Sequence, residues 1–291
     1  MGLTIVVFLG GCARSRPTFD GKRAFADLQT QVDFGPRVPG DEAHRRCAQW
    51  LHAQLATYAD SVTEQHFSGV IPGRLDSVGM INIIARFGTR AGRRVLLGAH
   101  WDTRPWADMD PDSTKWFQSF AGANDGASGV AVLLEIARGL DSIPPPVGVD
   151  LVLFDGEDAG DYGTTPGLWC QGSTYFAAHL PTRYEWVIVV DMVGDRDLYL
   201  PQEAYSLRLA RPLADRVWSL AARLGETAFA AGRGPEVFDD HIPFLMRGIP
   251  AIDVIDFEYA PWHTTQDVAD RCSPASLRSV GRVLIETLYS G

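Results

Sequence analysis

Apolar residues are spaced in two ways along this chain, and the two spacings alternate. Short apolar runs are typical of buried strands, and they occur at 78–87, 94–99, 149–155, 186–191 and 249–255. Apolar residues at helical spacing are typical of amphipathic helices, and they occur at 22–33, 41–58, 127–140, 172–180, 205–224 and 274–289. This alternation predicts an α/β fold, a three-layer α/β/α sandwich around a central, mostly parallel (mixed) sheet.

Polar, irregular segments separate these elements. The stretches 105–121 and 156–171 have neither spacing and are predicted to be loops. The segment FGPRVPG at 34–40 has the proline and glycines of a rigid turn between the first two helices. No internal repeat is apparent, and 291 residues suit one large α/β domain. Residues 21–291 are therefore expected to form a single domain.

The first twelve residues have the pattern of an export signal. Residues 3–9, LTIVVFL, are too few to span a bilayer but suit the apolar core of a signal peptide. The following Leu-Gly-Gly-Cys resembles a bacterial lipobox, which predicts a lipid on Cys12, a tether at 13–20 and a periplasmic or cell-envelope location. No Lys or Arg precedes the apolar run, so an apolar terminus without targeting function is the alternative.

Composition narrows the class of partner. The fractions of apolar residues (46%) and charged residues (21%) are ordinary for a soluble globular protein. The net charge of −10, without a basic stretch, argues against nucleic-acid binding. Membrane contact is expected only through the lipid at Cys12, and a monomer is the default because no coiled-coil pattern is seen.

The cysteines after residue 12 match no zinc-binding pattern. They are Cys47, Cys170 and Cys272, and their wide spacing and odd number fit neither a zinc knuckle nor a CxxC motif. Buried thiols are favoured. One disulfide, with a pairing that the sequence does not reveal, is the alternative.

Acidic and histidine residues end several of the apolar runs. These residues are His100, Asp125, Glu157 with Asp158, Asp191 and His263. In open α/β sheets, ligands bind at the carboxyl ends of the strands, so residues that are distant in sequence meet there. Carboxylate and imidazole groups without a cysteine set favour a catalytic zinc ion over a structural one.

Each of these residues also has a plainer interpretation. Asp125, in GANDGASG just before a helix, could be only an N-cap. Glu157 and Asp158 could form a solvated turn, although two adjacent carboxylates after an apolar strand are unfavourable unless a cation or proton compensates them. A lone histidine such as His263 is more often an ordinary polar residue than a ligand, but Trp262 and Asp267 beside it raise the odds of a site.

A further acidic pair, Asp239 with Asp240, precedes His241 and another apolar segment. Other catalytic signatures are absent from the sequence: there is no HExxH, GxSxG, Walker loop or GxGxxG. No cysteine lies in a context typical of a nucleophile.

Seven segments together resemble the M28 zinc peptidase superfamily. They are AHWDTRPWAD, GANDGASGVAVLLEIAR, FDGED, WCQGSTYFA, VVDMVGD, DDHIPF and PWHTTQD. More narrowly, they are similar to its glutaminyl cyclase branch, in particular the bacterial enzymes related to animal glutaminyl cyclases. The resemblance runs from residue 34 to the last helix and implies a zinc-aminopeptidase-like fold.

The resemblance also implies roles for individual residues. Asp125, Asp158 and His263 would bind one zinc ion, and Glu157 would be the proton shuttle. Asp191 and Asp239 would form a hydrogen-bonded acid network beside the substrate, and Trp262 and Trp169 would line its pocket. His100 matches a position that binds a second metal ion in the aminopeptidases of the superfamily, which makes it an additional candidate ligand. Asp158 stands where animal cyclases have Glu, so its reach toward the zinc ion is shorter.

The implied activity is cyclisation of an N-terminal glutamine, in a peptide or protein, to pyroglutamate with release of ammonia. The main alternative is an aminopeptidase with two zinc ions, because every ligand of a two-metal site is present in the sequence. A catalytically inactive module that binds peptide N-termini is a third hypothesis, which would require a broken site.

Overall fold

The computed structural model describes residues 16–161 and 168–290. The predicted signal segment and lipobox at 1–12 and the start of the predicted tether lie outside these residues. Within the described part of the chain, no helix is long and apolar enough to cross a membrane.

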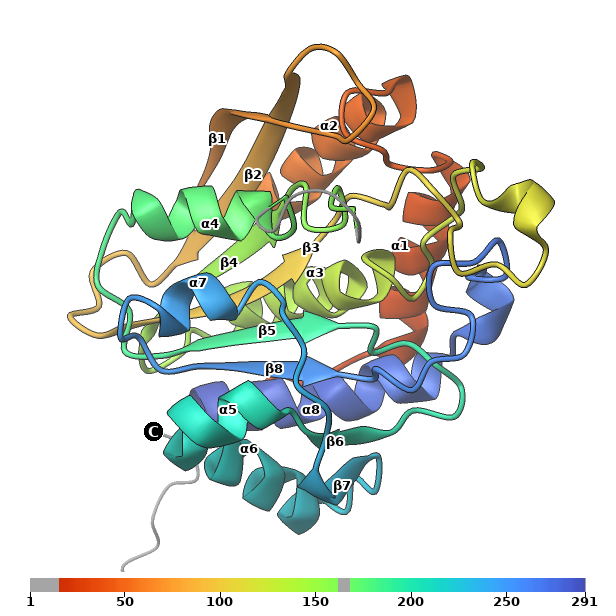
Figure 1. The fold of residues 1–291 in the computed structure, drawn as a ribbon. Coiled ribbons are helices and arrows are strands. Elements are labelled where there is room, and N and C mark those ends of the chain that lie inside the picture. Colours follow the sequence, from red (N-terminus) through yellow and green to blue (C-terminus); the bar gives the residue numbers. More distant parts are fainter. Residues whose placement is uncertain (1–15, 162–167, 291) are drawn as a thin grey trace, which may run out of the picture.

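A six-stranded mixed sheet forms the centre of the domain (Figure 1). Its strands are β1 (Ser61–Gly69), β2 (Val78–Phe87), β3 (Arg94–His100), β4 (Gly148–Phe154), β5 (Val187–Asp191) and β8 (Ala251–Ile255), in the spatial order β1-β2-β4-β3-β5-β8. The pairs β4–β3, β3–β5 and β5–β8 are parallel, and β1–β2 and β2–β4 are antiparallel. The predicted mostly parallel, mixed sheet is confirmed. A separate two-stranded sheet joins β6 (Leu200–Gln202) and β7 (Phe229–Arg233).

Helices cover both faces of the sheet. They are α1 (Gly21–Asp33), α2 (Glu42–Ala56), α3 (Ala127–Ser142), α4 (Gln171–Ala178), α5 (Ala204–Leu209), α6 (Arg211–Leu224), α7 (Ile242–Leu245) and α8 (Pro274–Tyr289), with short 3-10 turns at Ser113–Lys115 and Ala269–Arg271. The helices α1, α2, α3 and α8 lie on one face, α4 and α7 lie on the other, and α5 and α6 cover the β8 end (Figure 1). This arrangement is the predicted three-layer sandwich.

The burial of the central strands explains why their apolar runs are continuous. Every residue of β3, β4, β5 and β8 is buried, as expected for parallel strands that are covered by helices on both faces. Apolar residues of α1, α3 and α8 pack with these strands in the larger core cluster, and Phe154, Phe176 and Phe244 belong to a smaller cluster under α4 and α7. The clusters include Ala99, Phe154 and Val190, which lie at or next to the strand ends, and the strand ends carry the site.

One predicted helix is divided in the structure, and several short or exposed elements, among them β1, β6, β7 and α7, were not predicted from the sequence. The single helix predicted over 205–224 is two helices, α5 and α6, because Ala210 has non-helical φ and ψ (−136° and 33°) and Pro212 follows it in the first turn of α6. Proline removes a backbone donor and clashes with the preceding turn of a helix. The edge strand β1 was not predicted from the sequence, because its residues are mostly exposed and lack an apolar run.

The three described cysteines, Cys47, Cys170 and Cys272, are buried free thiols. The predicted buried state is therefore confirmed, and the alternative of a disulfide among them is not observed.

Candidate active site

The polar residues singled out in the sequence gather at one edge of the sheet. His100 and Asp191 are the last residues of β3 and β5, and Glu157 and Asp158 follow shortly after β4. Asp125 directly precedes the turn into α3, and His263 lies in the loop after β8. Parallel strands end at the same edge, which is the edge to which the arrowheads of β5 and β8 point in Figure 1.

The first cluster at this edge consists of Asp125, Asp158 and His263. One potential ligand atom of each residue lies within 4.8 Å of the other two. The Nε2 atom of His263 is 3.1 Å from Oδ1 of Asp158 and 3.5 Å from Oδ2 of Asp125. All three side chains are buried.

The cluster has the chemistry of a zinc site. Oδ2 of Asp125 and both carboxylate oxygens of Asp158 are buried and accept no hydrogen bond within the described part of the chain, which is unfavourable unless a cation or proton is present. Burial lowers the pKa of His263 to about 3, so the imidazole is neutral and keeps a lone pair for a metal ion. Burial also raises the pKa of Asp158 to about 7. Two carboxylates and one neutral imidazole are a donor set that suits catalytic zinc.

Two further carboxylates hold the backbone that carries these residues. The Asp267 carboxylate accepts the backbone N–H groups of Asn124 (2.8 Å) and Asp125 (3.1 Å), and it also accepts the Tyr259 hydroxyl (2.8 Å). Because Asp267 binds the main chain, it fixes where the Asp125 side chain begins. Ligand orientation by such outer groups is a general property of metal sites.

Asp102 holds the backbone of the segment with Glu157 and Asp158 in the same way. Its two oxygens accept the backbone N–H groups of Glu157 (3.1 Å) and Asp158 (3.2 Å). Gly126, with φ +87°, lets the chain pass close by, because a Cβ atom there would lie 2.7 Å from the Asp102 carbonyl oxygen and 3.0 Å from the His100 ring. The loops before α3 and after β4 are thus each held by a buried carboxylate.

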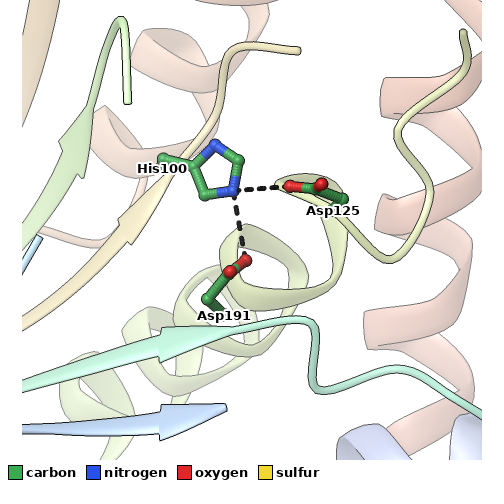
Figure 2. Close-up of side chains that lie close together, drawn as sticks. All are labelled: His100, Asp125 and Asp191. Carbon is green, nitrogen blue, oxygen red and sulfur yellow. Dashed lines mark hydrogen bonds and ion pairs between the residues drawn. The ribbon is translucent and has the colours of Figure 1, made fainter. Parts of the chain in front are cut away.

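The second cluster joins His100, Asp125 and Asp191, as Figure 2 shows. Nε2 of His100 lies 3.1 Å from Oδ1 of Asp125 and 3.1 Å from Oδ1 of Asp191. Burial lowers the pKa of His100, but Asp191 and the other neighbouring carboxylates outweigh it and raise this pKa well above its ordinary value. Asp125 therefore belongs to both clusters, and the two clusters together contain every metal ligand suggested by the sequence.

Glu157 lies beside these clusters rather than within the first one. Burial, together with the negative charges of Asp239 and Asp158, raises its pKa well above the ordinary value. The Cys170 thiol donates to Oε1 of Glu157 at 3.3 Å, and the Cys170 backbone N–H donates to the Glu157 carbonyl oxygen at 3.0 Å. A buried carboxyl group with a raised pKa is suited to move a proton near neutral pH.

A pocket of about 350 Å³ opens onto these groups. Its polar end includes Asp125, Glu157, Asp158, Asp191, Asp239 and His263. Aromatic side chains form much of the rest. The Trp262 ring stacks on His263 with 3.9 Å between centroids, and the Trp169 ring is parallel to the same imidazole within 2° at 6.2 Å. The pocket therefore combines an apolar wall with a dense group of acids.

The comparisons with known proteins agree with this geometry. The model of peptidase family M28 matches residues 82–288, which is more than half of the chain. The chain belongs to peptidase family M28.

Similar proteins are named either as glutaminyl cyclases (glutaminyl-peptide cyclotransferases) or as exopeptidases. The glutaminyl-peptide cyclotransferase-like protein of Mus musculus is 26% identical over 85% of this chain and 70% of its own length. The crystal structure of Bacteroides thetaiotaomicron glutaminyl cyclase has a TM-score of 0.90 and 35% identity, and covers 95% of this chain and 100% of its own. A Zn-dependent exopeptidase from Parabacteroides distasonis has a TM-score of 0.91 and 36% identity, with coverage of 95% and 100%.

Backbone strain in this M28 chain is concentrated at the site. Cys170, Met192 and His263 are the non-glycine residues with positive φ in the described part of the chain, at 54°, 48° and 54°. Such residues cost on the order of 1–3 kcal/mol each and persist where the surrounding structure enforces them. Met192 and His263 line the pocket, and Cys170 contacts Glu157.

Sequence reasoning missed a buried polar group behind the pocket. Glu203, His241 and Asp253 are fully or almost fully buried, and Asp239 lies between this group and the pocket. Asp253 stands in the apolar strand β8, and an acid in such a run is a signal that could have been followed. No sequence pattern marks Glu203, because its role depends on contacts made after folding.

Proposed function

We propose that this chain is a zinc-dependent glutaminyl-peptide cyclotransferase, which converts the N-terminal glutamine of peptides or proteins to pyroglutamate and releases ammonia. The observation that carries the proposal is the pocket itself. It is walled by Trp169 and Trp262 and ends at Glu157 beside Asp125, Asp158 and His263, in a chain that is similar along nearly its whole length to a glutaminyl cyclase.

The chain's own groups can support this reaction. Asp125, Asp158 and His263 would hold the zinc ion, which when bound acts as a Lewis acid on the γ-carbonyl group of the substrate glutamine. Trp262 and Trp169 enclose the glutamine side chain, so that its α-amine is held near the γ-carbon. Holding two reacting groups of one molecule together is itself a large source of rate enhancement.

Glu157 is the proton carrier in this scheme. It accepts a proton from the substrate α-ammonium group, and the freed amine forms a bond to the γ-carbon. The bond between this carbon and the amide nitrogen then breaks, and Glu157 returns the proton to the leaving group, which departs as ammonia. The attacking nitrogen loses its second proton as it becomes the lactam N–H, and Glu157, again a carboxylate, accepts this proton and releases it to solvent. Asp191 and Asp239, which line the same end of the pocket, provide negative charge that holds the α-ammonium group before its deprotonation.

One zinc ion per chain is part of the proposal. In the second cluster, His100 already directs Nε2 at two carboxylate oxygens, each 3.1 Å away (Figure 2). These are ordinary hydrogen-bond distances, so this cluster is consistent without a second ion. The same cluster is also the specific observation that favours the second candidate function, an aminopeptidase with two zinc ions.

A paired assay separates these two functions. Zinc-loaded protein is given a glutaminyl peptide and a leucine anilide, and the zinc content per chain is measured on the same sample. We expect ammonia and a pyroglutamyl peptide, an intact anilide and about one zinc ion. Anilide hydrolysis with about two zinc ions would instead identify an aminopeptidase.

We further propose that the protein is exported, anchored by a lipid on Cys12, and monomeric. The support for export and anchoring is the apolar run at 3–9 and the Leu-Gly-Gly-Cys that follows it. The support for a monomer is that no coiled-coil pattern is seen in the sequence. Membrane fractionation of cells that express the full chain tests this proposal. The wild-type protein should be found with the membranes, and the Cys12→Ala variant should be found in the soluble fraction. Equal distribution of both proteins would contradict the lipid anchor.

A further inference from the structure

Cys170 combines a buried thiol with a strained backbone at the edge of the site. It is fully buried and directly precedes α4, with φ 54° and ψ 38°. A residue other than glycine in this left-handed region carries an energetic cost, whereas glycine adopts the region readily. Glycine would therefore satisfy the backbone here at lower cost, and what the cysteine adds is its side chain.

The backbone hydrogen bonds of Cys170 fix this residue beside Glu157. The Cys170 N–H donates to the Glu157 carbonyl oxygen at 3.0 Å, and the Gln171 N–H donates to the Gly156 carbonyl oxygen at 3.1 Å. The Cys170 carbonyl oxygen accepts the Thr174 N–H at 3.0 Å, in the first turn of α4. The loop after β4 and the start of α4 are thus joined at Cys170, and these bonds set how far its backbone lies from that of Glu157.

The thiol of Cys170 contacts the carboxylate of Glu157 directly. It donates to Oε1, with 3.3 Å between the sulfur and oxygen atoms. The charged groups that face this carboxylate are those of His100, Asp158, Asp239 and Asp240. Among the residues that the structure describes, the thiol is the one group that donates a hydrogen bond to the Glu157 side chain. The thiol is therefore the contact that fixes the direction of Oε1.

The thiol is in the form that can donate this bond. Burial, together with the negative charge of Glu157, raises the pKa of Cys170 well above its ordinary value, so the group is S–H at neutral pH. A thiolate at this position would repel Glu157 and add an uncompensated buried charge. The same surroundings argue against Cys170 as a nucleophile, because the thiolate is the reactive form.

We propose that Cys170 is a positioning residue for the proton carrier: its thiol holds Oε1 of Glu157 and leaves Oε2 to exchange the proton with the substrate. The inference deepens the proposed function and rests on it for the task of Glu157. Oε2 has no hydrogen-bond donor among the described residues, and Glu157 lines the pocket. A carboxylate with one oxygen held and the other free presents one orientation to the substrate, as efficient proton transfer requires.

Removal and replacement of the thiol in the zinc-loaded protein test this role. We expect Cys170→Ala to lower kcat on a glutaminyl peptide by about 3- to 10-fold, the usual worth of one hydrogen bond. KM should change by less than about twofold, because the lost contact acts on the reaction step rather than on substrate binding. Cys170→Ser keeps a donor at this position, so its kcat should stay within about twofold of wild type. Cys47→Ala, which removes a buried thiol of α2 outside the pocket, is the matched control and should leave kcat unchanged.

Combination with Glu157→Gln separates a positioning role from a purely structural one. If Cys170 acts through the Glu157 carboxylate, C170A should change kcat by less than about twofold in the E157Q background, because groups that act together are not additive. An equal loss from C170A in both backgrounds would overturn the inference. So would equal losses in C170S and C170A, a wild-type kcat in C170A, or a lower zinc content in C170A, which would mean that the thiol supports the metal site.

Infrared spectroscopy examines the hydrogen bond without any activity. The S–H stretching band of Cys170, identified by its loss in C170A, should move to higher frequency in E157Q, because a neutral amide is a weaker acceptor than a carboxylate. A band at the same frequency in wild type and E157Q would overturn the inference. Failure of the wild-type protein to form pyroglutamate would reject the proposed function, whereas the infrared shift would still decide whether the thiol is bonded to Glu157.

Discussion

At the scale of single residues, the proposed function gives different tasks to two neighbours, Glu157 and Asp158. Asp158 directs buried oxygens at His263, whereas Glu157 contacts Cys170 and faces Asp239. We expect Glu157→Gln to lower kcat by about 10²- to 10⁴-fold, the usual contribution of a general acid–base residue, with zinc content unchanged. Asp158→Asn should instead lose zinc. The measurements are steady-state kinetics and metal analysis of each purified variant, and zinc loss in E157Q would show that the two roles are assigned wrongly.

Asp267 would support the proposed zinc site through the backbone of Asn124 and Asp125. Asparagine at this position has only one acceptor oxygen for the two backbone N–H groups of Asn124 and Asp125. We expect Asp267→Asn to weaken zinc binding by about 10- to 100-fold, as is usual for outer residues of metal sites, and kcat to recover at saturating zinc. Competition with a chelator measures this affinity.

Tyr259→Phe is the matched control for Asp267. It removes one hydrogen bond to the same carboxylate but leaves both backbone contacts in place. Its effect on zinc affinity should therefore be smaller than that of D267N. An effect as large as that of D267N would mean that the two backbone hydrogen bonds to Asp267 are not what holds Asp125 in place.

At the scale of elements, the sequence predicted those parts that are buried on both faces. The strands β3, β4, β5 and β8 have continuous apolar runs because helices cover them on both sides. The edge strand β1 is stabilised by pairing with β2 along its whole length, and this cross-strand contact leaves no pattern in its own residues. The break between α5 and α6 could have been predicted from Pro212.

The candidate site was predictable where its residues end apolar strands, and it was not predictable where side chains bind the backbone. Residues that end apolar strands, such as His100 and Asp191, could be grouped because parallel strands end at one edge. The backbone contacts of Asp102 and Asp267 could not be predicted, since an N–H group is present at almost every residue and gives no signal in the sequence. Asp253 is an intermediate case, because its position in an apolar strand was visible but the polar residues that lie near it, Asp239 and His241, were not predictable neighbours.

The contact between α3 and β5 gives a prediction about an element rather than a side chain. Gly129 in the first turns of α3 lies so close to β5 that an added Cβ atom would be 2.3 Å from the Val190 carbonyl oxygen. We expect Gly129→Ala to destabilise the protein by about 1–3 kcal/mol, as overpacking generally does, and to lower activity because Val190 precedes Asp191. Thermal unfolding and kcat/KM measure the two effects. Gly79→Ala, where nothing lies within 4 Å, is the control and should change neither.

At the scale of the whole molecule, the buried acids tie stability to pH and zinc. Burial raises the pKa of Asp267 to about 7 and that of Asp256 to about 6, whereas Asp in an unfolded chain has a pKa of about 4. At pH values between the unfolded pKa and the folded pKa of each group, the folded state therefore binds more protons than the unfolded state. The contribution of Asp267 and Asp256 to the free energy of unfolding of the metal-free protein therefore falls as pH rises from about 4 to about 7 and is constant at higher pH. His263, whose pKa burial lowers to about 3, acts in the opposite direction, but it is one group against several buried acids with raised pKa.

Zinc should reverse this trend, because it binds the folded protein and its ligands must be deprotonated. We expect Tm of the metal-free protein to fall as pH rises through this window, and the increase in Tm on adding zinc to become larger over the same range. The Asp256→Asn variant separates the two effects, since Asp256 lies outside the first cluster: its pH dependence should be weaker and its response to zinc unchanged. A Tm of the metal-free protein that rises with pH would mean that the buried acids are ionised without zinc, and that positive charges elsewhere in the fold compensate them.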